Sequence, residues 1–70
     1  MSLSSHSLGL ALREKRRSMG LTQEGLSMQT GISRPTIRAI EQGKPTAQIG
    51  LVLQLCADLG LVLELRDAGA

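Results

Sequence analysis

The 70-residue chain has room for one domain, and a core of this size usually needs support from a metal, from disulfides or from a second chain. Cys56 is the only cysteine and His6 the only histidine, which excludes an intrachain disulfide and argues against a metal site. The net charge is +2, but seven of the eight basic residues lie within residues 1–44, which favours a polyanionic partner for that part.

The chain is expected to begin with a flexible segment, residues 1–6, followed by a first helix over residues 7–18. Ser5 or Ser7 is the expected N-cap. An apolar stripe at helical spacing consists of Leu8, Leu12 and Met19.

A second and a third helix are predicted next, separated by a tight turn. Thr22 is a suitable N-cap for the second helix, which extends through Gln29, and Ser33 is a suitable N-cap for the third. Gly31 can take the positive φ that the turn between them needs. Pro35 is tolerated in the third helix because the first turn has no use for its N–H.

These two helices carry the pattern of a helix-turn-helix. Such a motif needs a small residue where the helices touch, a glycine in the turn, and inward apolar residues that hold a crossing angle of about 90–120°. The residues that meet these needs are Leu26, Ser27, Gly31, Ile32, Ile37 and Ile40. A two-helix corner of any packed helical protein is the alternative interpretation.

If Ile37 and Ile40 face the core, the opposite face of the third helix is free to read bases. The candidates on that face are Arg34, Pro35, Thr36, Arg38 and Ala39. Arginine forks match guanine O6 and N7 in the major groove, although an exposed arginine can also bind phosphate or nothing. Phosphate contacts that position the domain are expected from Thr22, Gln23, Ser33, Gln42 and Lys44.

A fourth helix is predicted over residues 47–59, started by Thr46 and stopped by Gly60. Its apolar residues cover more of its circumference than one small core can bury. Residues 61–66 then alternate with leucine at every second position, as a strand does. Because no other segment has a strand pattern, the economical solution is pairing of this strand with its own copy across a two-fold axis.

The resulting dimer shares a two-stranded ribbon. Its interface is expected to consist of Leu51, Leu55, Leu61, Val62, Leu63 and Leu65. A frayed tail or a continued helix is the alternative for residues 61–66, and residues 67–70 are assigned to a tail. The expected fold class is therefore all-α, with residues 7–60 as the DNA-binding domain and a short C-terminal strand that pairs across a dimer.

Three segments of the chain carry a family resemblance: Leu21-Thr-Gln-Glu-Gly-Leu, Gly31-Ile-Ser-Arg-Pro-Thr-Ile and Ile40-Glu-Gln-Gly. They resemble the phage Cro and cI repressor-type (XRE-like) helix-turn-helix family over residues 8–60. The resemblance implies a lambda-repressor-like domain of four or five helices. It also implies a structural ion pair between Arg16 and Glu41, whose disruption typically costs about 3–5 kcal/mol.

Within that family, Gly43-Lys-Pro-Thr-Ala-Gln-Ile-Gly followed by Leu59-Gly-Leu-Val-Leu-Glu-Leu is similar to the HipB-like antitoxins. This resemblance implies dimerisation through the C-terminal strand and repression of the protein's own operon. The partner that it implies is a HipA-like serine/threonine kinase toxin.

Taken together, these patterns predict a cytoplasmic, dimeric repressor that binds double-stranded DNA at an inverted repeat. No enzyme is expected, because the chain lacks clustered carboxylates and its lone histidine lies near the start. No catalytic residue, cofactor, metal, small-molecule substrate or membrane span is expected either. The alternative function is a module that binds a partner protein without reading DNA.

Overall fold

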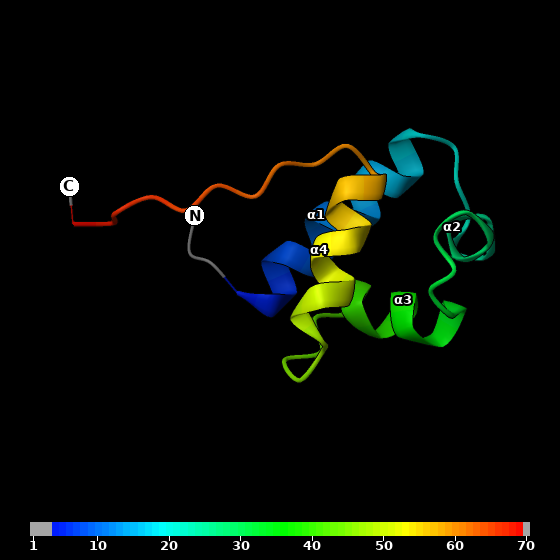
Figure 1. Ribbon diagram of the computed structural model, residues 1–70, viewed down its shortest axis with the longest axis horizontal. Helices are drawn as coiled ribbons and strands as arrows, with labels where there is room; N and C mark the ends of the chain where they lie inside the picture. Colours follow the sequence, from blue (N-terminus) through cyan, green and yellow to red (C-terminus); the bar gives the residue numbers. More distant parts are fainter. Residues whose placement is uncertain (1–3, 70) are drawn as a thin grey trace.

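The computed structural model describes residues 4–69 and folds them into four helices (Figure 1). The helices are α1 (Ser5–Ser18), α2 (Gln23–Thr30), α3 (Arg34–Glu41) and α4 (Ile49–Asp58). Helix α3 packs against both α1 and α2, and α4 packs against α2. The predicted all-α arrangement of four helices is confirmed.

Helix α1 begins earlier than predicted because a different serine caps it. The N-cap is Ser4, whose hydroxyl accepts a hydrogen bond from the Ser7 N–H at 3.0 Å, while the Ser7 hydroxyl accepts one from the Ser4 N–H at 3.1 Å. This reciprocal pair is a capping box. Ser5 and His6 are therefore helical, so the prediction that they are flexible is wrong; residues 1–3 lie outside the described part.

The connection between α2 and α3 has the predicted geometry. The Thr22 side chain accepts a hydrogen bond from the Gly25 N–H at 2.9 Å, and Gly31 ends α2 with φ +77°. A positive φ is accessible to glycine without steric penalty, so the chain reverses here and enters α3 directly. Ser33 is the N-cap of α3 by position, but its hydroxyl pairs with the Thr36 hydroxyl at 2.8 Å instead of capping the backbone.

A single apolar cluster holds the four helices together. Its buried members are Leu12, Leu26, Ile32, Ile37, Ile40, Val52, Leu55, Cys56 and Leu59. Burial raises the pKa of the Cys56 thiol, which favours its neutral form as a core side chain. Met19, predicted to join the stripe of α1, is instead 46% exposed, because it is the C-cap residue where the chain turns away from the helix.

The backbones of α1 and α3 approach closely at Gly9. A Cβ atom added there would collide with the Ile40 carbonyl oxygen and would lie 2.8 Å from the Glu41 carbonyl oxygen. Both colliding atoms are backbone, so no side-chain rotation relieves the contact. The glycine therefore sets how near the first helix lies to the end of α3.

Helix α4 begins at Ile49, two residues later than predicted, and its core face differs from the predicted interface. Val52, Leu55 and Leu59 follow the i, i+3, i+7 spacing that turns one stripe inward. Leu55 is 1% exposed within the chain's own core, so its assignment to a dimer interface is wrong. Leu51 is partly buried against the same core.

The segment after Gly60 leaves the helical body as an extended tail (Figure 1). Residues 61–67 are neither helix nor strand in the single chain. Leu61 still packs against the core, and its N–H donates to the Cys56 carbonyl at 2.8 Å, but Val62 and Leu65 are 83% and 91% exposed. A strand that pairs with a second copy has no partner within one chain, so the strand over residues 61–66 stays a prediction.

Candidate nucleic-acid interface

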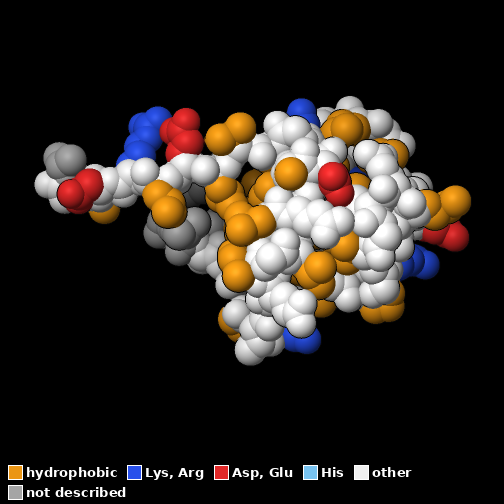
Figure 2. All heavy atoms as spheres, viewed as in Figure 1, with side chains coloured by type: hydrophobic (Ala, Val, Ile, Leu, Met, Phe, Trp, Pro, Cys, Tyr) orange, Lys and Arg blue, Asp and Glu red, His pale blue; other side chains and the backbone are white. Residues whose placement is uncertain are grey.

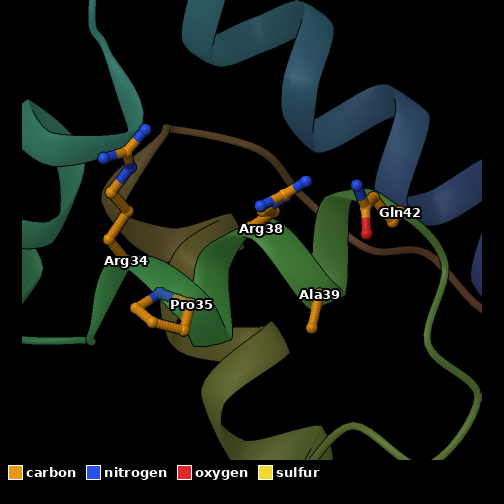
Figure 3. Close-up of a pocket in the computed structure, with 5 residues that line it drawn as sticks. All are labelled: Arg34, Pro35, Arg38, Ala39 and Gln42. Carbon is orange, nitrogen blue, oxygen red and sulfur yellow. The ribbon is translucent and has the colours of Figure 1, made fainter.

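The exposed face of α3 is the first candidate surface. Ile37 and Ile40 are buried, which leaves Arg34, Pro35 and Arg38 exposed on the opposite side and Thr36 and Ala39 half-buried beside them. A hollow of about 450 Å³ on this face is lined by Arg34, Pro35, Arg38, Ala39 and Gln42 (Figure 3). All five predicted base-reading residues therefore lie on or beside an open face of α3.

Both arginines of this face are available to a ligand. Figure 3 shows the two guanidinium groups rising from the same side of α3, with Gln42 beyond Arg38. The ion pairs within residues 4–69 join other side chains, so neither Arg34 nor Arg38 is neutralised by a carboxylate there. Unpaired guanidinium groups on an exposed helix can make the bidentate contacts that guanine edges or phosphates accept.

A buried ion pair fixes the position of α3 relative to α1, as the family resemblance implied. The Arg16 Nε donates to Glu41 Oε2 at 2.7 Å, and Arg16 Nη2 donates to Glu41 Oε1 at 3.0 Å, with side chains only 8% and 3% exposed. The third contact runs from Arg16 Nη1 to the Leu21 carbonyl at 2.8 Å. Hydrogen bonding to Glu41 raises the pKa of Arg16, so this guanidinium remains protonated.

Gln23 belongs to the same buried cluster, which the sequence alone did not indicate. Its side-chain Nε2 donates to Glu41 Oε1 at 3.2 Å. One N–H of the side-chain amide predicted to meet a phosphate is therefore engaged inside the protein, and its second N–H is left for an anion. The backbone N–H of Gln23 lies in the first turn of α2, where helical N–H groups have no partner within their own helix.

The other predicted phosphate-binding residues differ in whether their side chains already have a hydrogen-bond partner within the protein. Thr22 and Ser33 have hydroxyls that already make local hydrogen bonds at the helix starts. Gln42 and Lys44 are exposed: Gln42 lines the hollow with Arg34, whereas Lys44 lines a second hollow of about 420 Å³ on another flank of α3. These two side chains therefore lie on different flanks of α3.

A third hollow lies between α1 and α3, and we call it the α1–α3 cleft. It measures about 340 Å³ and is lined by Arg13, Arg16, Arg17, Gln23, Arg38, Glu41 and Gln42. The sequence alone did not assign Arg13 and Arg17 to any site, because a basic run on a helix is often only a solvated face. Their spacing of four residues was the available signal, since it places both on one side of α1.

Two other features, a metal site and a membrane-spanning helix, are absent from the described residues. Residues 4–69 contain no cluster of three or more side chains that could hold a metal ion. None of the helices α1 to α4 is long and apolar enough to span a bilayer.

Comparison with known proteins identifies relatives that are named as HTH-type transcriptional regulators. Over 62 residues the chain is 37% identical to an uncharacterized HTH-type transcriptional regulator, y4mF, of Sinorhizobium fredii, covering 89% of this chain and 82% of that protein. An uncharacterized HTH-type transcriptional regulator of Methanothermobacter thermautotrophicus is 39% identical over 49 residues, covering 70% of this chain and 71% of the relative.

The fold of this chain is also similar to that of solved structures. The chain superposes on a structure described as a HipB-O4 20mer complex with a TM-score of 0.86 and 26% sequence identity, covering 97% of this chain and 96% of the other. The model of the protein family described as helix-turn-helix domain matches residues 7–69 of this chain. This chain therefore belongs to the helix-turn-helix domain family.

Proposed function

We propose that this protein is a sequence-specific DNA-binding transcriptional regulator that places α3 in the major groove. The observation that carries the proposal is the open face of α3, where Arg34 and Arg38 have no carboxylate partner within residues 4–69. The relatives named as HTH-type transcriptional regulators support it. Family members of this kind need no catalytic group, so the proposal includes none.

The proposed regulator acts as a dimer, and the apolar surface at the start of α4 supports this. Figure 2 shows hydrophobic side chains gathered where the tail meets the helical body. A hollow of about 640 Å³ there is lined by Ser4, Ser5, Leu8, Ile49, Leu53, Leu63, Glu64 and Leu65. Ile49 and Leu53 thus replace Leu55 in the proposed interface, and two α3 helices about 34–36 Å apart would read an inverted repeat.

Truncation after Gly60 tests the dimer. Without residues 61–70 the proposed ribbon cannot form and part of the apolar hollow is lost, so the truncated chain is expected to sediment as a monomer. The full chain is expected to sediment as a dimer at the same concentration in analytical ultracentrifugation. A truncated chain that remains fully dimeric would show that the tail does not hold the subunits together.

Arg34→Ala tests base reading. Selection of duplexes from a random 30-base-pair library is expected to give the wild type a two-fold symmetric site. The variant is expected to lose about 1–3 kcal/mol of discrimination at one base pair in each half-site, because one bidentate guanine contact is removed. Lys15→Ala is the control, since it removes one charge from α1 outside the three hollows around α3.

Two results would contradict the proposed function. The first is a wild-type chain that binds no duplex at moderate salt, as expected of a module that binds only proteins. The second is an Arg34→Ala variant that keeps both the affinity and the base preferences of the wild type.

We further propose that the regulator is the DNA-binding antitoxin of a HipA-like kinase. The superposition on HipB over nearly the whole of both chains supports this proposal. A HipA-like reading frame beside its gene, and co-purification of that kinase with this chain after co-expression, are the expected findings. Absence of such a frame would instead indicate a free-standing repressor.

A further inference from the structure

We propose that the α1–α3 cleft binds one backbone phosphate of duplex DNA, held by Arg13 and Arg17 of α1 together with Arg38 of α3. This inference rests on the proposed DNA binding and extends the binding surface to α1. It assigns Arg13 and Arg17 a role that no motif in the sequence indicated.

The geometry brings two rows of side chains to one cleft. Arg13 and Arg17 are one helical turn apart on α1, and Arg38 and Gln42 are one turn apart on α3, so each pair shares a face of its helix. All four line the α1–α3 cleft, with the buried Arg16–Glu41 pair among its lining residues. An anion in this cleft therefore meets donors from two helices whose spacing is fixed by that pair.

The electrostatics of the cleft favour an anion. Glu41 is the only acidic residue that lines it, and both of its oxygens are already engaged by donors from Arg16 and Gln23. In the described part of the chain the ion pairs are Arg16–Glu41 and Glu64–Arg66, so Arg13, Arg17 and Arg38 keep uncompensated charges. Like charges four residues apart on a helix repel each other, and the attraction of both to a bound phosphate offsets that repulsion.

Helix α2 adds to the positive electrostatic potential in the α1–α3 cleft. It begins at Gln23, which lines the cleft, so the positive end of its dipole lies there. The adjacent hollow on the exposed face of α3 shares Arg38 and Gln42 with the cleft. A phosphate in the cleft would therefore lie beside the bases that the open face of α3 contacts, and Arg38 can bridge the two sites.

The test compares the double variant Arg13→Gln/Arg17→Gln with the control Lys15→Gln on the duplex selected by the wild type. Both arginines are exposed, so the double variant is expected to keep the wild-type melting temperature. Its affinity is expected to fall about tenfold or more, because charge-assisted hydrogen bonds are lost. The slope of log affinity against log salt is expected to become shallower by about 0.9 for each phosphate contact removed, with unchanged base preferences.

A scan of neutral methylphosphonate linkages along the same duplex locates the phosphate. For the wild type, one such position in each half-site is expected to weaken binding at least as much as the double variant does, because Arg38 loses its contact there as well. In the double variant the same linkage is expected to cause a much smaller further loss, since only the contact from Arg38 to that phosphate then remains to be removed.

The outcomes separate this inference from the proposed function. A wild type that binds the duplex together with a double variant that behaves like Lys15→Gln overturns the phosphate site and leaves DNA binding intact. Fully additive effects of the linkage and the double variant overturn it as well. A wild type that binds no duplex overturns the proposed function, and the phosphate site with it.

Discussion

Glu41→Gln is expected to destabilise the domain by about 3–5 kcal/mol, because it leaves the buried Arg16 guanidinium without a compensating charge. The guanidinium loses the negative partner of its two contacts at 2.7 and 3.0 Å, in a place where little water reaches it. A small domain has a total stability of about 5–15 kcal/mol, so this change removes a large part of it. Urea unfolding followed by circular dichroism at 222 nm measures the effect.

The exposed ion pair of the tail supplies the matched control. Glu64 and Arg66 pair at 3.0 Å, but their side chains are 63% and 84% exposed. Arg66→Gln, which removes the pair from the side that does not line the proposed dimer interface, is therefore expected to change stability very little, as is usual for ion pairs in water. Arg16→Met combined with Glu41→Leu is expected to regain most of the stability, since no buried charge is then left unpaired. A Glu41→Gln variant as stable as the wild type would show that the pair does not hold α1 to α3.

Gly9→Ala is expected to destabilise the protein by about 2 kcal/mol, although alanine favours helices more than glycine by about 1 kcal/mol. The added methyl group collides with the backbone carbonyls of Ile40 and Glu41, and overpacking of this kind typically costs about 1–3 kcal/mol or more. The two helices must therefore separate, which also disturbs the Arg16–Glu41 contacts. Thermal unfolding and urea unfolding both report the loss.

Gly50→Ala is the control for Gly9→Ala. Gly50 also lies in a helix, but a Cβ atom added there has no atom within 4 Å. Only the helix propensity changes, so this variant is expected to gain up to about 1 kcal/mol. If the two substitutions change the free energy of unfolding in opposite directions, the contact between Gly9 and α3 decides the effect, and not the exchange of glycine for alanine. The same sign for both would rule that explanation out.

Local signals in the chain predicted most of the helix-turn-helix correctly. Thr22 caps α2, Gly31 takes a positive φ, and Ile37 and Ile40 are buried, as their spacing indicated. The resemblance to the Cro and cI repressor-type family implied the Arg16–Glu41 pair, which the structure confirms. These features depend on the conformation of a few neighbouring residues or on a motif that many chains share.

The errors occurred where the chain offers several similar residues and hydrophobicity does not distinguish between them. Several serines lie around the start of α1, and Ser4 is the one that forms a reciprocal pair with Ser7 as the N-cap. Leu55 and Leu53 are equally apolar in sequence, yet the phase of α4 buries the first and leaves the second 48% exposed. Neither the capping serine nor the phase is encoded by hydrophobicity alone.

The sequence by itself determined the helical class, the turn at Gly31 and the exposed face of α3, because these follow from backbone preferences and a periodicity of 3.6 residues. Only the tertiary structure decided that Gly9 lies against the α3 backbone, that Gln23 bonds to Glu41, and that Arg13 and Arg17 share a cleft with α3. Those features depend on how two helices far apart in the chain approach each other. The approach is set by the whole core at once, so no local pattern specifies it.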